Sequence, residues 1–370
     1  MKTRKVLGIL ALALGVSVMS LFGGCGSKPA VDENNSAVSQ NVDENSTENE
    51  SGTEDSNSSE NTENSDENNE VEKAEEKITI AYPENMQERG FEEAVVLEKM
   101  PVKVVSMSNL PVITLDELGV NMVAIPESSV ANWSEDLDAK TTKLKVAMNS
   151  NFDIEKVIAL EPDLVIMNYS NKDDYGKIVE EANVPVYYVD AGHTVSYDSI
   201  KKVTQELINA FGKDTEKGKE IMAKFDATEK RLAKCKETYA GKTVMVMLSS
   251  PPSHYVQTKN ATLGSMLDMI GFTNVVDNPR APMLPMDMEK AIEYVPDYVF
   301  VVGASKTSEE FETIMAKAFA ENEDYWNSVD AIKDGNIIYL PVQYIASSGI
   351  DDLDKINDLI DLIEAKYGEK

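Results

Sequence analysis

The sequence contains little cysteine, little histidine and few of the clusters that build metal sites. Of its 370 residues only two are cysteine, Cys25 and Cys235, so a framework of intrachain disulfides is excluded. Only two are histidine, His193 and His254. A zinc or manganese site that needs three or four His, Cys and carboxylate ligands is therefore hard to assemble.

The chain also lacks the short motifs of common catalytic sites and any excess of positive charge. It contains no G-x-S-x-G, no G-x-x-x-x-G-K-[ST], no G-x-G-x-x-G and no H-E-x-x-H. Its 35 Lys and Arg against 65 Asp and Glu give a formal net charge of −30. This balance argues against nucleic acid as a partner, because phosphate binding needs clustered Lys and Arg. These absences favour a binding protein over an enzyme.

The first 77 residues do not have the composition of a folded domain. Residues 1–25 join a positively charged start to an apolar run that ends at Cys25, which predicts a secretory signal. Residues 26–77 are polar, and positions 31–70 hold 13 Asp and Glu without one Lys or Arg. Such a segment cannot bury enough apolar surface to fold, so we expect a disordered acidic tether.

One stretch of sixteen residues occurs twice in the rest of the chain. Residues 152–167 and 286–301 match at seven positions with a constant offset of 134. Each copy has apolar residues at helical spacing and then a Pro-Asp pair, which we expect to end the helix. An apolar run without polar alternation follows, as in a strand buried on both faces of a parallel sheet. The repeat predicts two α/β lobes built on one plan, with a ligand cleft between them.

The order of strand and helix patterns indicates the domain plan. Strand and helix patterns alternate over residues 78–196 and again over residues 242–370, which predicts α/β lobes with parallel-type central sheets. Residues 197–241 break this alternation with two helix patterns. The second has no Gly or Pro from Lys219 to Thr238, so we expect a long rigid backbone helix between the lobes. The stretch Ser249–Tyr255 is predicted as the loop after the first strand of the second lobe.

These features together resemble a known family, the substrate-binding lipoproteins of ABC importers with a helical backbone. The resemblance covers about residues 100–368, and its most recognisable motif is the repeated phrase E-K-x-I-x-x-x-P-D-x-V. It implies an extracytoplasmic, lipid-anchored monomer that carries haem, a ferric siderophore or cobalamin to an ABC permease and its ATPase. It also implies cleavage before Cys25 and lipidation of that residue. An ordinary cleaved signal peptide or a short membrane anchor is the alternative.

The resemblance gives a role to one carboxylate in each copy of the repeat. Glu155 and Glu289 occupy equivalent positions, and in such proteins these glutamates dock on basic residues of the permease. The alternative is that both are solvated helix residues.

Within this family the second lobe is similar to the haem-receptor lipoproteins of Gram-positive surface haem-uptake systems. The similar phrases cover residues 246–256, 263–276 and 325–340. The related receptors hold haem iron with a methionine from the loop before the first repeat and a histidine from the second lobe. Met148 lies in the matching loop, whereas the matching second-lobe stretch, Val302–Ser305, has no histidine. The resemblance favours haem as the ligand, with a ferric siderophore as the alternative.

Two other side chains could take the place of the missing histidine. Met283 lies in nearly the equivalent loop of the second lobe, so a Met148/Met283 pair could hold iron across the cleft. His254, in the loop after the first strand of that lobe, is the rival ligand. Each has an ordinary alternative, since methionines often fill core gaps and histidines often lie on the surface.

Four further residues are candidates for contacts with the rest of the ligand. Tyr169 and Tyr255 could stack on a porphyrin or ligate iron as tyrosinate, although half-buried tyrosines at cleft edges are common. Arg280 would suit a propionate or a siderophore carboxylate, or be a surface arginine. His193 follows a strand whose end we expect to face the cleft.

Functions of two other classes need features that the sequence lacks. An extracellular enzyme acting on a corrinoid or chelate would need clustered acids or a nucleophile–base pair, which the spacing does not show. A signalling or sensor domain would leave Glu155 and Glu289 at equivalent positions without a reason.

Overall fold

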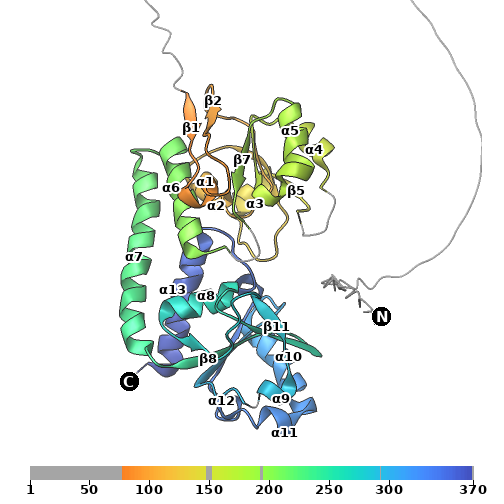
Figure 1. The fold of residues 1–370 in the computed structure, drawn as a ribbon, viewed down its shortest axis with the longest axis vertical. Helices are drawn as coiled ribbons and strands as arrows, with labels where there is room; N and C mark the ends of the chain where they lie inside the picture. Colours follow the sequence, from red (N-terminus) through yellow and green to blue (C-terminus); the bar gives the residue numbers. More distant parts are fainter. Residues whose placement is uncertain (1–76, 147–151, 192–194, 292, 369–370) are drawn as a thin grey trace, which may run out of the picture. The chain divides into compact units, whose positions relative to one another are not determined.

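Two large β-sheets organise the part of the chain that the structure describes (Figure 1). The structure is a computed structural model, and it describes residues 77–146, 152–191, 195–291 and 293–368. We call the parts built on the two sheets the first lobe and the second lobe.

The first lobe contains a five-stranded, fully parallel sheet in the order β5-β4-β3-β6-β7. Its three central strands are buried almost throughout, which is why their sequences are apolar without alternation. A separate antiparallel pair, β1 and β2, precedes this sheet. The strands are β1 (Ile78–Ile80), β2 (Val95–Leu97), β3 (Val104–Ser106), β4 (Met122–Pro126), β5 (Thr142–Leu144), β6 (Leu164–Asn168) and β7 (Val186–Val189).

Helices cover the first sheet and connect its strands. They are α1 (Glu84–Gln87), α2 (Val112–Glu117), α3 (Glu135–Lys140), α4 (Ile154–Ile158), α5 (Lys177–Glu181) and α6 (Tyr197–Phe211), with short η1 (Tyr169–Asn171) and η2 (Lys172–Gly176) segments after β6.

The second lobe contains a mixed six-stranded sheet in the order β11-β9-β8-β12-β13, with β10 also beside β8. The neighbours β8, β12 and β13 run parallel, whereas β9 and β11 add antiparallel edge strands. The strands are β8 (Thr243–Ser250), β9 (Ser253–Gln257), β10 (Thr273–Asn274), β11 (Met283–Pro285), β12 (Tyr298–Val302) and β13 (Ile337–Leu340).

Each face of the second sheet has its own helical cover. One face packs on α7, α8 and α13, and the other packs on α10, α11 and α12. The helices of this part of the chain are α7 (Glu216–Tyr239), α8 (Thr262–Ile270), α9 (Met288–Ala291), α10 (Ser308–Glu321), α11 (Glu323–Trp326), α12 (Asp330–Lys333) and α13 (Asp351–Tyr367), with η3 (Val342–Tyr344) after β13.

The predicted fold class is confirmed, with one local correction in the second lobe. The chain is α/β, with two parallel-type sheets and a long connecting helix. The stretch predicted as a loop over Ser249–Tyr255 is instead a tight hairpin: β8 continues to Ser250 and β9 begins at Ser253. The Pro251-Pro252 pair that suggested a loop forms only the turn.

Helix α7 joins the two lobes through its buried side chains. Its first half places Ile221 and Phe225 in the core of the first lobe. Its second half places Leu232 and Cys235 in the core of the second lobe. The helix begins where the Thr215 side chain accepts a hydrogen bond from the Gly218 N–H (3.0 Å) and then continues for 24 residues. One continuous helix therefore contributes to both cores, as the absence of an internal Gly or Pro predicted.

The start of α13 forms a second junction between the lobes. Ile350 and Leu353 belong to the core of the first lobe, whereas Ile356 belongs to that of the second. Gly349 has φ +91°, and a Cβ there would lie 2.2 Å from the carbonyl oxygen of Leu110. Only glycine fits both the left-handed backbone and this close approach.

A buried lysine holds this junction in place. Lys355 is 4% exposed, and its Nζ donates to Ser348 Oγ (2.5 Å) and to Asp352 Oδ1 (2.9 Å). Asp352 Oδ1 also accepts from the Ser348 N–H (3.2 Å). The ammonium group thus ties the turn before α13 to the first turn of the helix, because a buried charge must be paired.

The Pro-Asp aspartates of the sixteen-residue repeat each accept hydrogen bonds near the start of a neighbouring strand. Asp163 Oδ2 accepts from the backbone N–H groups of Val102 and Lys103 (2.7 and 2.9 Å), just before β3. Asp297 Oδ2 accepts from the N–H of Thr243 (2.7 Å), at the start of β8. In each lobe the Pro-Asp carboxylate therefore fixes the amino end of the neighbouring parallel strand.

This finding corrects the role that we expected for the Pro-Asp pair. Helix α4 ends at Ile158, before Pro162, and Glu161 between them has φ +50°. The helix thus ends before the residue that precedes the proline. In both lobes the aspartate of the pair contacts the start of a strand, and the pair does not itself end the helix.

Candidate functional site

The carboxyl ends of the first-lobe strands form the edge where a ligand site is expected. The chain runs from β3 outward to β4 and β5, and later returns to β6 on the other side of β3. In open α/β sheets, ligands bind outside the carboxyl ends at such a reversal of strand order. Here the turn after β3 is held by a hydrogen bond from the Met107 N–H to the Ile166 carbonyl (2.7 Å) and by Ser106, whose hydroxyl donates to the Ser108 carbonyl (2.7 Å).

A depression of about 240 Å³ opens at this edge, between β3, β5 and the start of α4. Lys143, Lys145 and Lys156 lie around it, and Lys143 is already paired with Asp138 (3.0 Å). Its lining residues are Met107, Lys143, Leu144, Lys145, Val146, Phe152, Asp153, Lys156 and Val157. Three lysines and one aspartate around an apolar floor would suit an anionic ligand group.

Tyr169, predicted from the sequence, lies at this edge directly after β6. Its hydroxyl accepts a hydrogen bond from Arg89 Nη1 (2.9 Å), and the Arg89 guanidinium carbon lies 4.5 Å from the centre of the tyrosine ring. Arg89 Nη2 also donates to Asp190 Oδ2 (2.9 Å), just after β7. Sequence reasoning missed Arg89 and Asp190, because no motif links residues so far apart in the chain.

In the second lobe, His254 lies on β9 against α11. Its Nδ1 is 3.1 Å from Ser249 Oγ, and its ring meets Trp326 edge-on with 5.3 Å between the ring centres. Burial lowers the pKa of His254, so the imidazole is neutral at pH 7, as a metal ligand must be. The residue two positions on, Val256, belongs to the core beneath α10–α12, so His254 lies on that face of the sheet.

Tyr255 and Met283 lie on the opposite face from His254. Tyr255 is the neighbour of His254 on β9, and successive residues of a strand point to opposite faces. Met283 lies directly opposite Gln257, two residues beyond Tyr255, so it shares the Tyr255 face. The structure therefore brings Tyr255 and Met283 together and separates both from His254.

The positions of Met283 and Arg280 differ from the sequence prediction in detail. Met283 was predicted in a loop, but it begins edge strand β11 and is 43% exposed. Arg280 lies in the loop before β11, and its side chain is exposed. Its backbone N–H donates to Asn278 Oδ1 (2.9 Å), which fixes the loop and leaves the guanidinium at the surface.

Three predicted residues fall outside the described part of the chain. These are Cys25, Met148 and His193. Their roles as lipidation site, iron ligand and cleft residue stay predictions.

The stretch where related receptors have the second-lobe histidine is closely packed at Gly303. Gly303 follows β12, and a Cβ at this position would lie 2.1 Å from the Phe311 ring. Any larger residue would require this aromatic ring to move. The stretch Val302–Ser305 therefore contributes close backbone packing rather than a ligand side chain.

Glu155 and Glu289 are exposed in equivalent surroundings. Each follows an aspartate that caps its helix: Asp153 Oδ1 accepts from the Lys156 N–H (3.1 Å), and Asp287 Oδ1 accepts from the Glu289 N–H (3.1 Å). Among the ion pairs between described residues, none includes either glutamate. Both carboxylates are accessible to a partner.

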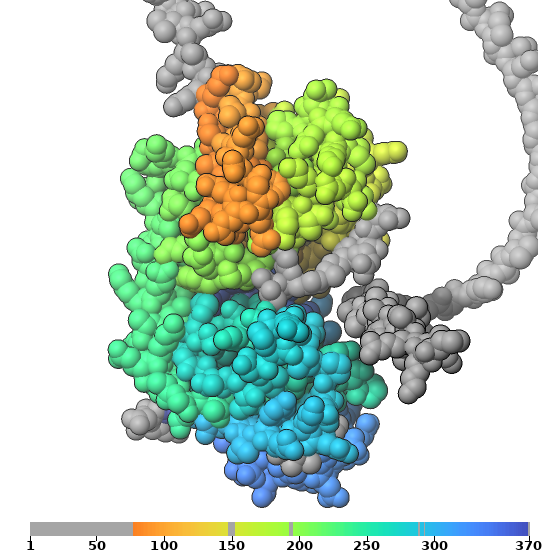
Figure 2. Space-filling view, viewed as in Figure 1, coloured from red at the N-terminus to blue at the C-terminus, as the bar shows by residue number. Residues whose placement is uncertain are grey.

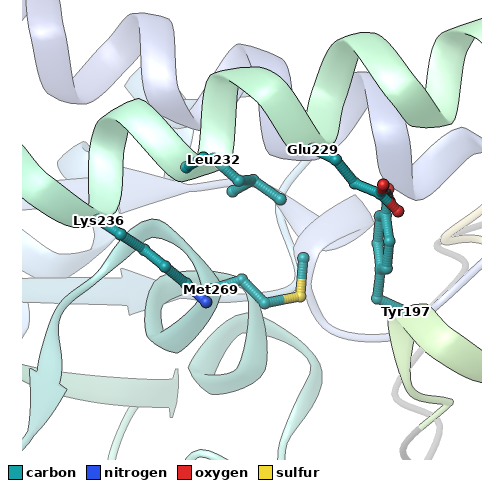
Figure 3. A pocket seen from close by; sticks show the side chains of 6 residues that line it. Tyr197, Glu229, Leu232, Lys236 and Met269 are labelled. Carbon is teal, nitrogen blue, oxygen red and sulfur yellow. Dashed lines mark hydrogen bonds between the residues drawn. The ribbon is translucent and has the colours of Figure 1, made fainter.

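A separate groove of about 280 Å³ lies along the connecting helix, away from the strand ends (Figure 3). Tyr197 and Glu229 lie at one end and Lys236 at the other, with Leu232 and Met269 between them. Lys201 pairs with Glu229 (2.6 Å), so the carboxylate at this end is already neutralised. The groove belongs to the packing of α7 on α8, and no predicted site residue lines it.

The described residues contain neither a cluster of metal-ligating side chains nor a membrane-spanning helix. Residues 77–146, 152–191, 195–291 and 293–368 contain no group of three or more His, Cys, Asp or Glu that could hold a metal ion. None of the helices in these ranges is long and apolar enough to cross a membrane.

Comparison with known proteins identifies the family of this fold. A model of the periplasmic binding proteins matches residues 104–344, well over half of the chain, and spans both lobes. The chain belongs to the periplasmic binding protein family. This family consists of substrate-binding proteins, so the expectation that the chain is not an enzyme is confirmed.

Three relatives show how far the likeness extends. This periplasmic binding protein is 25% identical over 264 residues to the petrobactin-binding protein YclQ of Bacillus subtilis, covering 69% of this chain and 80% of YclQ. It is 23% identical over 301 residues to YvrC of the same organism, an uncharacterized ABC transporter substrate-binding lipoprotein, covering 79% and 88% of the two chains. The crystal structure of Staphylococcus aureus IsdE complexed with heme matches with a TM-score of 0.56 at 20% identity, over 70% of this chain and 98% of that one. This structural likeness supports the fold.

Proposed function

We propose that this periplasmic binding protein captures an iron-containing small molecule and delivers it to an ABC permease. The observation that carries the proposal is the family match over both lobes, since related chains serve ABC importers. We further propose that Cys25 carries a lipid, that residues 26–77 are a tether, and that the lobes begin near residues 78 and 242. The monomer would then work at the extracytoplasmic face of the membrane.

Haem and a ferric siderophore are the two ligands that the relatives support. IsdE was crystallised with heme, and YclQ is named for petrobactin. Haem is the ligand that the sequence resemblance favours. The lysines around the depression beside β5 suit either ligand, because they offer charges to haem propionates as well as to siderophore carboxylate or catecholate oxygens.

The proposed iron ligands are Met148 together with either His254 or Met283. His254 has the chemistry of an iron ligand, a neutral imidazole, but it lies on the face covered by α11. Met283 is exposed on the same face as Tyr255, which supports a thioether and an aromatic contact acting together. Arg280 and His193 remain proposed contacts for the ligand periphery.

Titration of the purified protein with haem and with a ferric catecholate tests the proposal. Haem bound by Met148 should give a saturable one-to-one shift of the Soret band, altered by Met148→Ala and by the variant of its true partner, His254→Ala or Met283→Ala. Met100→Ala, at an exposed methionine of the first lobe, is the matched control and should leave the spectrum unchanged.

The two titrations separate the ligand from the class of function. Saturable quenching of tryptophan fluorescence by the catecholate, without a Soret shift, would make a siderophore the ligand. Binding of neither compound, nor of cobalamin, at micromolar concentration would contradict the capture of an iron chelate or corrinoid.

A further inference from the structure

A cluster of cations and aromatic rings lies beside the predicted Tyr169, on the carboxyl edge of the first-lobe sheet. We call it the Arg89–Lys172 patch, and it consists of Arg89, Phe91, Tyr169, Lys172, Tyr188 and Asp190. No sequence motif pointed to it, and its two cations have no part in the proposed function so far. The segment of residues 78–97, orange in Figure 2, lies at the surface on the face shown.

The two cations of the patch are held against aromatic faces. Lys172 Nζ lies 4.6 Å from the centre of the Phe91 ring and 5.5 Å from that of Tyr188. The Arg89 guanidinium lies 4.5 Å from the centre of the Tyr169 ring. Cations over rings keep their charge and a fixed position while their outer side faces solvent.

The charges of the patch do not cancel. Asp190 pairs with Arg89 (2.9 Å), whereas the ion pairs between described residues do not include Lys172. The Arg89 contacts use two of the five guanidinium N–H donors, and its side chain is 42% exposed. The six patch residues therefore carry one net positive charge and unused Arg89 donors, and Glu180 adds a carboxylate at the Tyr188 hydroxyl (2.8 Å).

The patch lies where ligands of such sheets bind. Tyr169 follows β6 and Asp190 follows β7, and these strands are parallel neighbours whose carboxyl ends meet at one edge. The turn after β3 and the lysine-lined depression lie along the same edge. Neighbouring strands are about 5 Å apart, so an elongated ligand at this edge would reach the patch.

We propose that the Arg89–Lys172 patch binds an anionic oxygen group of the ligand next to its planar ring. The inference rests on the proposed capture of an iron chelate and assigns it a negatively charged, oxygen-bearing periphery. Haem propionates and siderophore catecholates or carboxylates share this chemistry. Arg89 and Lys172 supply hydrogen bonds to the oxygens, the Tyr169 and Phe91 rings hold these two cations in place, and Asp190 orients Arg89.

The test compares probes that differ in the anionic group. Haem is paired with its dimethyl ester, in which the propionates are neutral, and a ferric tris-catecholate is paired with cationic ferrioxamine B. We expect Arg89→Gln and Lys172→Gln each to lower the affinity for the anionic probe by about tenfold, since each removes a charge-assisted hydrogen bond. The affinity for the neutral or cationic probe of each pair should fall less than twofold.

Two control variants separate binding from packing. Lys177→Gln removes a nearby exposed lysine that pairs only with Asp173 (2.7 Å), and it should leave every dissociation constant unchanged. If Arg89 only neutralised Asp190, Arg89→Gln/Asp190→Asn would restore wild-type affinity. Continued weak binding by the double variant, with unchanged melting temperature, supports direct contact by Arg89.

The outcomes distinguish this inference from the proposed function. A loss of affinity for haem but not for its dimethyl ester identifies propionates as the bound group. A loss of affinity for the catecholate but not for ferrioxamine B identifies a siderophore. Equal effects on both members of a probe pair, or no effect of either variant, would overturn the inference and leave iron-chelate capture standing. Failure of the wild-type protein to bind any of the four probes would remove the proposed function and the inference with it.

Discussion

His254 shows at the scale of one residue how the fold sets a chemical property. Its ring is half-buried between Ser249 and Trp326, and that burial lowers its pKa from the ordinary value of 6.5. A group with a depressed folded-state pKa contributes stability above its unfolded pKa. That contribution is lost as the pH falls through about 6.5 toward the folded pKa.

Acidification should therefore destabilise the protein in part through this histidine. We expect the free energy of unfolding to fall between pH 7.5 and pH 5, and to fall less in His254→Gln, because that variant has no proton to bind. Urea denaturation followed by circular dichroism at both pH values measures this difference. Ser253→Ala, an exposed neighbour on β9, should keep the wild-type pH dependence. The same loss in wild type and His254→Gln would show that His254 does not contribute.

Single residues also show the limit of sequence reasoning about the site. Tyr169 could be predicted because it follows an apolar strand pattern, and such positions lie at carboxyl ends. Arg89 could not, because it is 80 positions from Tyr169 and 101 from Asp190, and only the tertiary fold brings them together. Its local sequence is that of a short exposed turn.

At the scale of elements, the hydrophobic pattern of the sequence predicted the strands and the helix whose burial is regular along their length. Strands β6 and β12 and helix α7 were predictable because one kind of environment extends along each of them. The β8–β9 hairpin was not, since Pro251-Pro252 has the composition of a loop whether or not a strand follows. Its antiparallel pairing moved His254 and Tyr255 from a loop onto a strand.

The hydrogen bonds of Asp163 and Asp297 to the neighbouring strands, which we call the strand clamp, give a prediction at this scale. Asp163→Ala leaves the N–H groups of Val102 and Lys103 without their acceptor, and Asp297→Ala leaves the N–H and hydroxyl of Thr243 without theirs. Each should lower the free energy of unfolding by about 1–3 kcal/mol, and the double variant by about the sum, because the sites share no partner. Urea denaturation measures these losses.

An exposed aspartate provides the comparison for this experiment. Asp173→Ala removes only a surface ion pair with Lys177 and should cost less than about 1 kcal/mol. Losses at Asp163 or Asp297 no larger than at Asp173 would mean that the clamp contributes nothing to stability.

At the scale of the whole molecule, the equivalent glutamates lead to a prediction about transport. Both carboxylates are exposed, and we propose that one from each lobe docks on the permease. Glu155→Ala/Glu289→Ala should therefore abolish ligand uptake into cells while leaving ligand affinity unchanged. Uptake of a radiolabelled iron chelate and a binding titration measure the two effects. Glu181→Ala/Glu293→Ala, which removes one other exposed glutamate from each lobe, is the matched control. Normal uptake by the glutamate double variant would favour a sensor over an importer component.

The junction at α13 has a consequence for when the first lobe can fold during synthesis. The sheet of the first lobe is complete in sequence by Val189, yet its core also contains Ile350 and Leu353. During translation that core stays incomplete and partly exposed until almost the whole chain has emerged. The lobe made first is therefore finished last, and a nascent chain stopped before Gly349 exposes apolar surface to chaperones and proteases.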